Sequence, residues 1–277
     1  MNKLLSAGFA RMFKFRMFWI ITVLSAALTA LMRLFMYFQS QKVDASIPLD
    51  SGFFFAVAFS GIAMAVFCSF FVGTEYNDGT MRNKLAVGHS RLAVYFSNLV
   101  VCAVAGVIFL ASSCLASLLI GIPLFGFFTG SAASFLFLLA LSLAVIIAYT
   151  AIFVLIAMTN QSKAASAVIA LLLAFTLFFA ATYIYSSLNE PEFYDAYEYT
   201  ENGVTVSESS EPNPNYLTGA KRQVYEILFD CLPGCQASRV AQMYDPEPEA
   251  VFALYSCLIV LLTTAGGAAA FKRKNIK

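Results

Sequence analysis

The sequence is short of charge and of histidine. Only 12% of its 277 residues are charged, whereas soluble domains carry about 25%, and His89 is the single histidine. The phosphate loop G-x-x-x-x-G-K-[ST], the zinc motif H-E-x-x-H and the nucleophile motif G-x-S-x-G are absent, as is any basic stripe. We therefore expect a non-enzymatic chain with no catalytic residue, no cofactor or metal of its own, and no nucleic-acid partner.

Long apolar runs are what the sequence has instead. Hydrophobic residues make up 60% of the chain, and a helix needs about 20 consecutive apolar residues to cross a hydrocarbon core of about 30 Å. Several runs reach that length without a charge, and a soluble fold could not bury so much apolar surface. The sequence predicts an all-α integral membrane protein with six transmembrane helices. They are expected near residues 17–38, 51–72, 92–120, 131–158, 164–187 and 250–271.

The segment before the first span is amphipathic rather than apolar. At 100° per residue, Leu5 and Phe9 share one side of a helix while Arg11 and Lys14 share the opposite side. We expect residues 1–16 to form a helix in the membrane interface, with its basic side toward lipid head groups. A cleaved secretory signal is the alternative, although the apolar run that follows is longer than a typical signal core.

The basic residues set the predicted orientation, because they stay preferentially in the cytoplasm. An internal N-terminus puts most of them on the cytoplasmic side, and six spans return the C-terminus there. The predicted organisation has five spans within residues 17–187, a cytoplasmic link at 73–91, an external cap at 188–249 and a basic cytoplasmic tail at 272–277. We expect a multi-pass protein of the plasma membrane with both termini in the cytoplasm.

Ionisable residues are scarce in the predicted spans. No acidic residue falls inside one, and only Arg33 approaches one, near the outer end of the first span, where it can snorkel outward. Ion-coupled carriers usually keep ionisable groups or broken helices near the midplane. Such a carrier is therefore disfavoured, although Asn98 and Thr150 leave it as an alternative, together with a passive channel. Energy for active transport would have to come from another subunit.

The external cap is the one long predicted segment outside the spans. Its prolines break any long helix, but residues 221–230 are expected to form a short amphipathic helix with Val224 and Ile227 on its apolar side. Part of the cap can return into the bilayer where protein buries it. Cys231 and Cys235 are close enough to form a disulfide or to remain free thiols.

The cytoplasmic link reads GTEYNDGTMRNKLAVGHSR, with expected breaks at Gly79 and Gly88. It resembles the corresponding link of ABC-2 class ABC transporter permeases. Family members typically have a Glu just after the second span, then Gly-Thr, a basic residue and Ser-Arg. The matching residues here are Glu75, Gly79, Thr80, Arg82, Ser90 and Arg91. His89 stands where the family often has Pro.

Two further segments are similar to the same family. Leu232-Pro233-Gly234-Cys235-Gln236 resembles a Leu-Pro-x-Gly-Gln-like segment before the last span, with Gly and Cys in shifted places. The ending Phe271 to Lys277 resembles the Phe-x-Arg/Lys-Lys-Asp-x-Lys tail of bacterial members, with Asn275 in place of Asp. The resemblance covers the whole chain in layout. In the cap, it singles out Leu232, Pro233, Gly234 and Gln236 as candidate functional positions.

The resemblance implies the permease subunit of an ABC exporter in a bacterial plasma membrane. It implies a second permease subunit, identical or different, and a separate ABC ATP-binding subunit that holds ATP-Mg. The link at 73–91 would dock on that subunit, with Glu75 as a hydrogen-bond anchor and with Arg82 and Arg91 contacting the ATPase or lipid phosphates. The alternative within the family is a peptide-sensing or immunity component, in which the acidic, tyrosine-rich stretch 193–199 would bind a cationic peptide.

Overall fold

The protein is a bundle of long helices. A computed structural model describes residues 1–43, 47–194, 197–201, 204–208, 210–242 and 250–274. Among these residues, six helices are long and apolar enough to cross a membrane, which confirms the predicted fold class and number of spans. They are α2 (Arg16–Val43), η1 (Phe55–Phe59) continued by α3 (Ser60–Asn77), α5 (Arg91–Phe125), α6 (Ala132–Thr159), α7 (Lys163–Leu188) and α10 (Ala250–Arg273).

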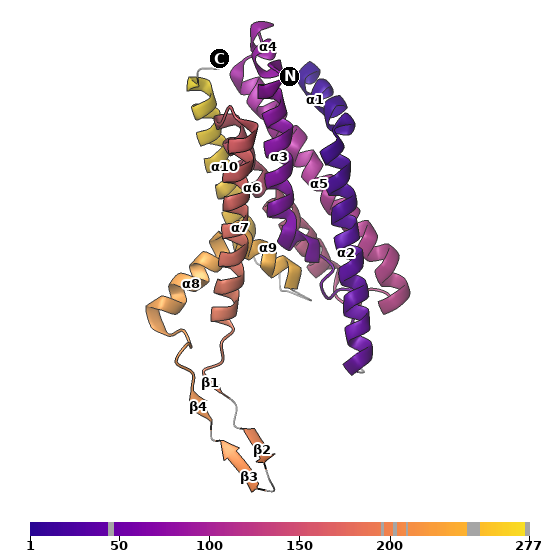
Figure 1. The fold of residues 1–277 in the computed structure, drawn as a ribbon, viewed down its shortest axis with the longest axis vertical. Coiled ribbons are helices and arrows are strands. Elements are labelled where there is room, and N and C mark those ends of the chain that lie inside the picture. The colour runs from indigo at the N-terminus through magenta and orange to yellow at the C-terminus, as the bar shows by residue number, and fades with distance from the viewer. Residues whose placement is uncertain (44–46, 195–196, 202–203, 209, 243–249, 275–277) are drawn as a thin grey trace.

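The bundle has two distinct ends (Figure 1). The N-terminal helix α1 (Asn2–Lys14), the short helix α4 (Thr80–Ala86) and the end of α10 lie together at one of them, which we call the terminal end. The strands project from the opposite, hairpin end. The first and last described segments therefore lie on the same side of the bundle.

Helix α5 carries a row of small residues that lets its neighbours approach closely. Cys102, Gly106 and Gly121 are all buried. A Cβ added to Gly106 would lie 2.6 Å from the Ile146 side chain on α6, and one on Gly121 would overlap the side chain of Leu49. This row of small residues is thus packing surface within the chain.

Several helix boundaries differ from the predicted ones, and two of the differences bear on the links between the spans. Helix α3 continues beyond Val72 to Asn77, so the first part of the predicted link is helical. Helix α5 runs through Pro123 to Phe125, and the chain turns at Gly126, whose φ is 83°. Pro123 has no N–H to donate, and only two helical residues follow it, so the helix loses this one bond close to where it ends.

The segment between α7 and α10 combines hairpins with helices (Figure 1). The amphipathic helix predicted over 221–230 is confirmed, with Val224 and Ile227 exposed on its apolar side. The paired strands were not predicted. Strand β1 (Phe193–Tyr194) pairs antiparallel with β4 (Glu211–Pro212), β2 (Tyr197–Glu201) pairs with β3 (Val204–Glu208), and α8 (Gly219–Cys231) and α9 (Pro233–Gln242) follow.

Helix α9 returns into the bundle instead of staying outside it. Pro233, Gly234 and Gln236 are buried, and a Cβ on Gly234 would overlap the carbonyl oxygen of Leu177 on α7. Only glycine allows this close approach between the two backbones. Part of the predicted cap is therefore enclosed by protein, as anticipated.

Candidate functional site

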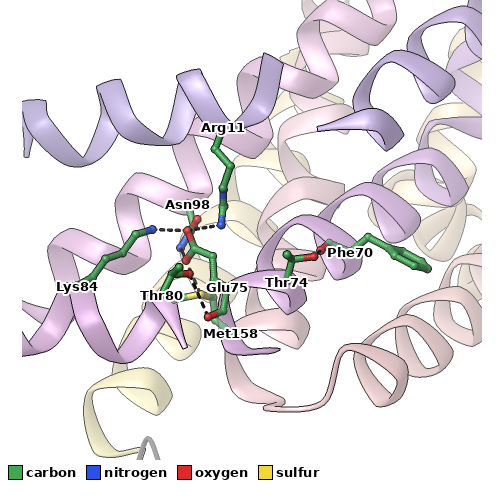
Figure 2. A network of polar contacts seen from close by, with 8 residues as sticks. All are labelled: Arg11, Phe70, Thr74, Glu75, Thr80, Lys84, Asn98 and Met158. Carbon is green, nitrogen blue, oxygen red and sulfur yellow. Dashed lines mark hydrogen bonds and ion pairs between the residues drawn. The ribbon is translucent and has the colours of Figure 1, made fainter. Parts of the chain in front are cut away.

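A buried carboxylate lies at the terminal end, near the last turn of α3. Glu75 is 1% exposed, and Figure 2 shows side chains from several helices pointing toward it. Its Oε1 accepts from Arg11 Nη1 at 2.6 Å and also from Lys84 Nζ, while its Oε2 accepts from Asn98 Nδ2 at 3.0 Å. One side chain thus joins α3 to α1, α4 and α5. We call Glu75, Arg11, Lys84 and Asn98 the Glu75 cluster.

The charges of this cluster depend on one another. The Arg11 guanidinium lies over the Phe71 ring, 3.8 Å from its centroid, and its Nε and Nη2 have no partner within the described part of the chain. Burial lowers the pKa of Arg11, and the charge of Glu75 acts in the opposite direction. Removing Glu75 would leave a largely buried cation without compensation, which is strongly unfavourable.

The position of Arg11 corrects the predicted orientation of α1. Arg11 was expected on the side of α1 that faces lipid head groups, whereas it points into the protein. The reason is that Leu4, Gly8 and Met12 form the buried face of α1. A Cβ on Gly8 would lie 2.8 Å from the Val101 side chain on α5. Helix α1 is therefore packed on the bundle along one side.

Helix α4 has an inner and an outer face. The predicted breaks are confirmed, because Gly79 and Gly88 take positive φ values of 67° and 96° on either side of it. On the inner face, Met81 is buried, Lys84 contacts Glu75, and Thr80 Oγ1 donates to the Glu75 carbonyl at 3.2 Å. The outer face is exposed. It comprises Arg82, Asn83, Ala86 and the adjoining Val87, which is 80% exposed.

The predicted site residues Ser90 and Arg91 form hydrogen bonds with other parts of the same chain. Ser90 caps α5, where its Oγ accepts from the Ala93 amide at 3.2 Å. Arg91 Nη1 donates to the carbonyls of Phe271, at 3.1 Å, and Lys274. Cationic side chains stabilise helix C-termini in this way. Arg91 thereby ties the start of α5 to the end of α10.

A second polar group adjoins the Glu75 cluster through Tyr76. The Tyr76 hydroxyl donates to the Met158 carbonyl at 2.6 Å, and Lys274 Nζ donates to the same carbonyl at 3.0 Å. The Lys274 ammonium also lies 4.5 Å from the centroid of the Tyr76 ring. Burial lowers the pKa of Lys274 to about 8. The ends of α3, α6 and α10 are thus joined beside the cluster.

The predicted residues of the cap form a separate site near the hairpin end. Gln236 Nε2 donates to the carbonyls of Asp230, at 2.6 Å, and Phe252, at 3.1 Å, while Ser256 Oγ donates to Gln236 Oε1. Leu232 and Pro233 form the turn from α8 into α9. Gln236 therefore joins α8, α9 and α10 with neutral hydrogen bonds. Cys231 and Cys235 are free thiols.

Two predictions about charge in the spans are wrong. Glu75 lies inside the candidate span Phe55–Asn77, because α3 extends past the apolar run. Arg33 does not snorkel outward. It is 1% exposed and donates to the carbonyls of Ser51, at 2.8 Å, and Leu49, at 3.1 Å. In each case the polar partners lie elsewhere in the chain and satisfy the buried charge.

The partners of Glu75 were missed as site residues. Arg11 was assigned to the lipid-facing side of α1, and Lys84 was not singled out in the link. Asn98 carries the clearest signal, since it is a polar residue within a long apolar run, and such residues in a span are usually functional or paired.

Comparison with known proteins places the chain in a family. A family model described as ABC-2 family transporter protein matches residues 4–180, which is more than half of the 277 residues. The matched region contains most of α1, the Glu75 cluster and all of α4. No individually curated protein matches the sequence. The chain belongs to the ABC-2 family of transporter proteins, as a membrane component with multiple spans.

Proposed function

We propose that the chain is the permease subunit of an ABC exporter and that a separate ATP-binding subunit, which holds ATP-Mg, supplies the energy through α4. The observation that carries this proposal is the two-faced geometry of α4. Its inner face is bonded to Glu75, while Arg82 and the 80% exposed Val87 lie on its outer face. The exposed apolar Val87 and the charged Arg82 lie outside the spans, and together they form a surface that a protein partner could bind.

Movement of α4 would pass into the bundle through the Glu75 cluster. Lys84 and Thr80 bind α4 to α3, and Glu75 then contacts Arg11 on α1 and Asn98 on α5. Transport requires that the docked α4 favour one nucleotide state of the ATPase over the other, because a partner without differential affinity shifts no equilibrium. The permease residues themselves perform no chemistry in this mechanism.

The terminal end would lie in the cytoplasm, where the ATPase is available. Exposed basic residues gather there, in agreement with the preference of Lys and Arg for cytoplasmic segments. The hairpin end would be external, and a second permease subunit, identical or different, would complete the pathway in a bacterial plasma membrane. The exposed basic residues at the terminal end include Lys3, Lys14, Arg82, Lys272 and Arg273.

The test changes the outer face of α4 and leaves its inner face intact. The chain carrying Arg82→Glu and Val87→Asp is co-expressed with ABC ATP-binding subunits of the same genome, and the complex is isolated. We expect loss of the ATPase from the complex and loss of ATP-dependent transport in vesicles, with unchanged thermal stability, because both side chains are exposed. Lys272→Ala, at the same end but outside α4, is the matched control.

Two outcomes would contradict the proposal. Wild-type association and transport in the double variant would exclude docking through this face. Uphill transport by the purified chain alone, driven by an ion gradient, would favour the ion-coupled carrier and remove the need for an ATPase.

A sensing role is the second candidate, because the strands project beyond the helices at the hairpin end (Figure 1). Phe193 and Tyr194 on β1 are 50% and 45% exposed, and Asn213 Nδ2 closes the base of the hairpin by donating to Glu190 Oε2 at 3.0 Å. Replacing residues 193–212 by a short Gly-Ser link would keep this base. An unchanged response to added cationic peptides would dispose of the sensing role, and lost response with intact ATPase association would support it.

A further inference from the structure

An apolar groove of about 310 Å³ lies between α2, η1, α3 and α5. Phe109 lines it from α5, Leu24 from α2 and Ala63 from α3. None of the four residues of the Glu75 cluster lines it. The groove is therefore distinct from the site described above.

The few hydroxyl groups in the groove are already used. Ser60 Oγ donates to the Val57 carbonyl at 2.6 Å, and Ser113 Oγ donates to the Phe109 carbonyl at 3.1 Å. Ser25 Oγ donates to its own helix in the same way. A buried water needs two to four polar partners, so water is poorly held here. An empty apolar space of this size would forfeit many dispersion contacts. The groove therefore suits an apolar occupant.

The groove opens toward the bilayer and matches one leaflet in length. Ile20 and Leu24 line it and are also 54% and 63% exposed, which places its rim on the lipid-facing side of α2. The lining residues of α2 run from Met17 to Leu28. At 1.5 Å per residue this is about 16 Å, close to half of a hydrocarbon core of about 30 Å.

Basic residues stand at the terminal end of the groove. Arg16 directly precedes Met17, the first lining residue of α2, and both Arg16 and the nearby Lys14 are exposed. A phosphate is attracted to such a pair, while an acyl chain fits the apolar channel that follows. We infer that the groove binds one acyl chain of a phospholipid from the leaflet at the terminal end, with its phosphate beside Arg16 and Lys14.

Fluorescence quenching can test this inference because Trp19 is the only tryptophan of the chain. In a Trp19→Phe background, Phe109→Trp places the sole indole in the groove, at a residue 5% exposed. The full chain is reconstituted in vesicles of phospholipid with brominated acyl chains. We expect this indole to be quenched at least half as strongly as the lipid-facing Trp19 of the unmodified chain.

The matched control places the indole in the protein core. Phe153→Trp, in the same background, replaces a residue of α6 that is 0% exposed, and it should be quenched little. If the Phe109→Trp indole is shielded as well as this control, the groove is empty or covered by a second subunit, and the inference is wrong. Should Phe109→Trp fail to fold, Ile21→Trp on the α2 side of the groove serves as the reporter.

Filling the groove gives an independent measurement. Ala63→Phe should abolish the quenching and the retention of phospholipid in native mass spectrometry, because the added ring fills the space that the acyl chain would occupy. Arg16→Gln should lower retention of anionic over zwitterionic phospholipid while quenching by the neutral brominated lipid persists. Unchanged quenching in Ala63→Phe would overturn the inference.

Discussion

Two side chains, Glu75 at the terminal end and Gln236 on α9, each form a hub that joins several helices, yet the two hubs use different chemistry. Glu75 at the terminal end is a carboxylate held by two cations and an amide. Gln236 near the hairpin end is a neutral amide held by two carbonyls and a hydroxyl. A neutral hub can only hold its helices together. The charged hub lies beside the exposed helix α4, whose Lys84 pairs with Glu75 (Figure 2). A partner that moves α4 therefore also changes how the buried charge of Glu75 is compensated.

The largest expected effect comes from breaking the charged hub. Glu75→Ala removes the acceptor of Arg11 and Lys84, and loss of one member of a buried ion pair typically costs about 3 to 5 kcal/mol. We expect a marked fall in the stability of the purified chain, measured by thermal unfolding, and loss of ATP-dependent transport. Glu75→Gln is the matched control, since it keeps an acceptor oxygen for Arg11. Because Glu75→Gln also removes the charge, a Glu75→Gln chain as stable as the wild type would show that charge is not what this hub contributes.

Breaking the neutral hub should weaken the fold less and leave coupling intact. Gln236→Leu deprives the part-buried carbonyl of Asp230 and the buried carbonyl of Phe252 of their donor, and an unsatisfied buried group costs about 1 to 3 kcal/mol. We expect a moderate fall in unfolding temperature, with ATPase association unchanged. Loss of ATPase association in this variant would mean that the two ends are functionally joined, and the contrast between the hubs would fail.

The backbone contact beside the neutral hub sharpens the comparison. Gly234→Ala would push a Cβ against the carbonyl of Leu177, and overpacking of this kind costs about 1 to 3 kcal/mol. Gly266→Ala is the matched control, because nothing lies within 4 Å of the Cβ that it would add. Thermal unfolding should separate the two variants, with only the first destabilised. Equal effects would indicate that helix propensity, and not the α7–α9 contact, decides the outcome.

Sequence patterns were sufficient for the parts of the fold that depend on local composition. Apolar runs gave the six spans, and glycines in a polar link gave the breaks at Gly79 and Gly88. The end of α3 was missed because Thr74 and Glu75 are polar and read as link residues. Their helical continuation depends on contacts with other helices, which no local pattern contains.

The candidate site was predictable only in part, for the same reason. Glu75 was identified as an anchor from the family resemblance, but its main partners are distant in sequence. Arg11 and Asn98 come from α1 and α5 and meet Glu75 only after the helices pack. The helical periodicity of α1 placed Arg11 with Lys14 on a lipid-facing side. Such a pattern contains no information about a buried carboxylate on another helix. Arg33 was misplaced likewise, since its acceptors are loop carbonyls.

The smallest expected effect concerns the polar group beside the charged hub, and it depends on pH. Burial lowers the pKa of Lys274 from 10.5 to about 8, so between these values the unfolded chain holds a proton that the folded chain has released. Stability contributed by this residue should therefore rise as pH increases from about 8 to 10.5 and stay constant below that window. The measurement is the difference in unfolding temperature between the wild type and Lys274→Met at pH 7 and pH 9.5. Because both Tyr76 and the nearby Arg91 remain in the variant, their titration cancels in the difference. If the difference in unfolding temperature is the same at both pH values, Lys274 keeps its proton in the folded chain. The buried charges at this end would then be governed by the Glu75 cluster alone.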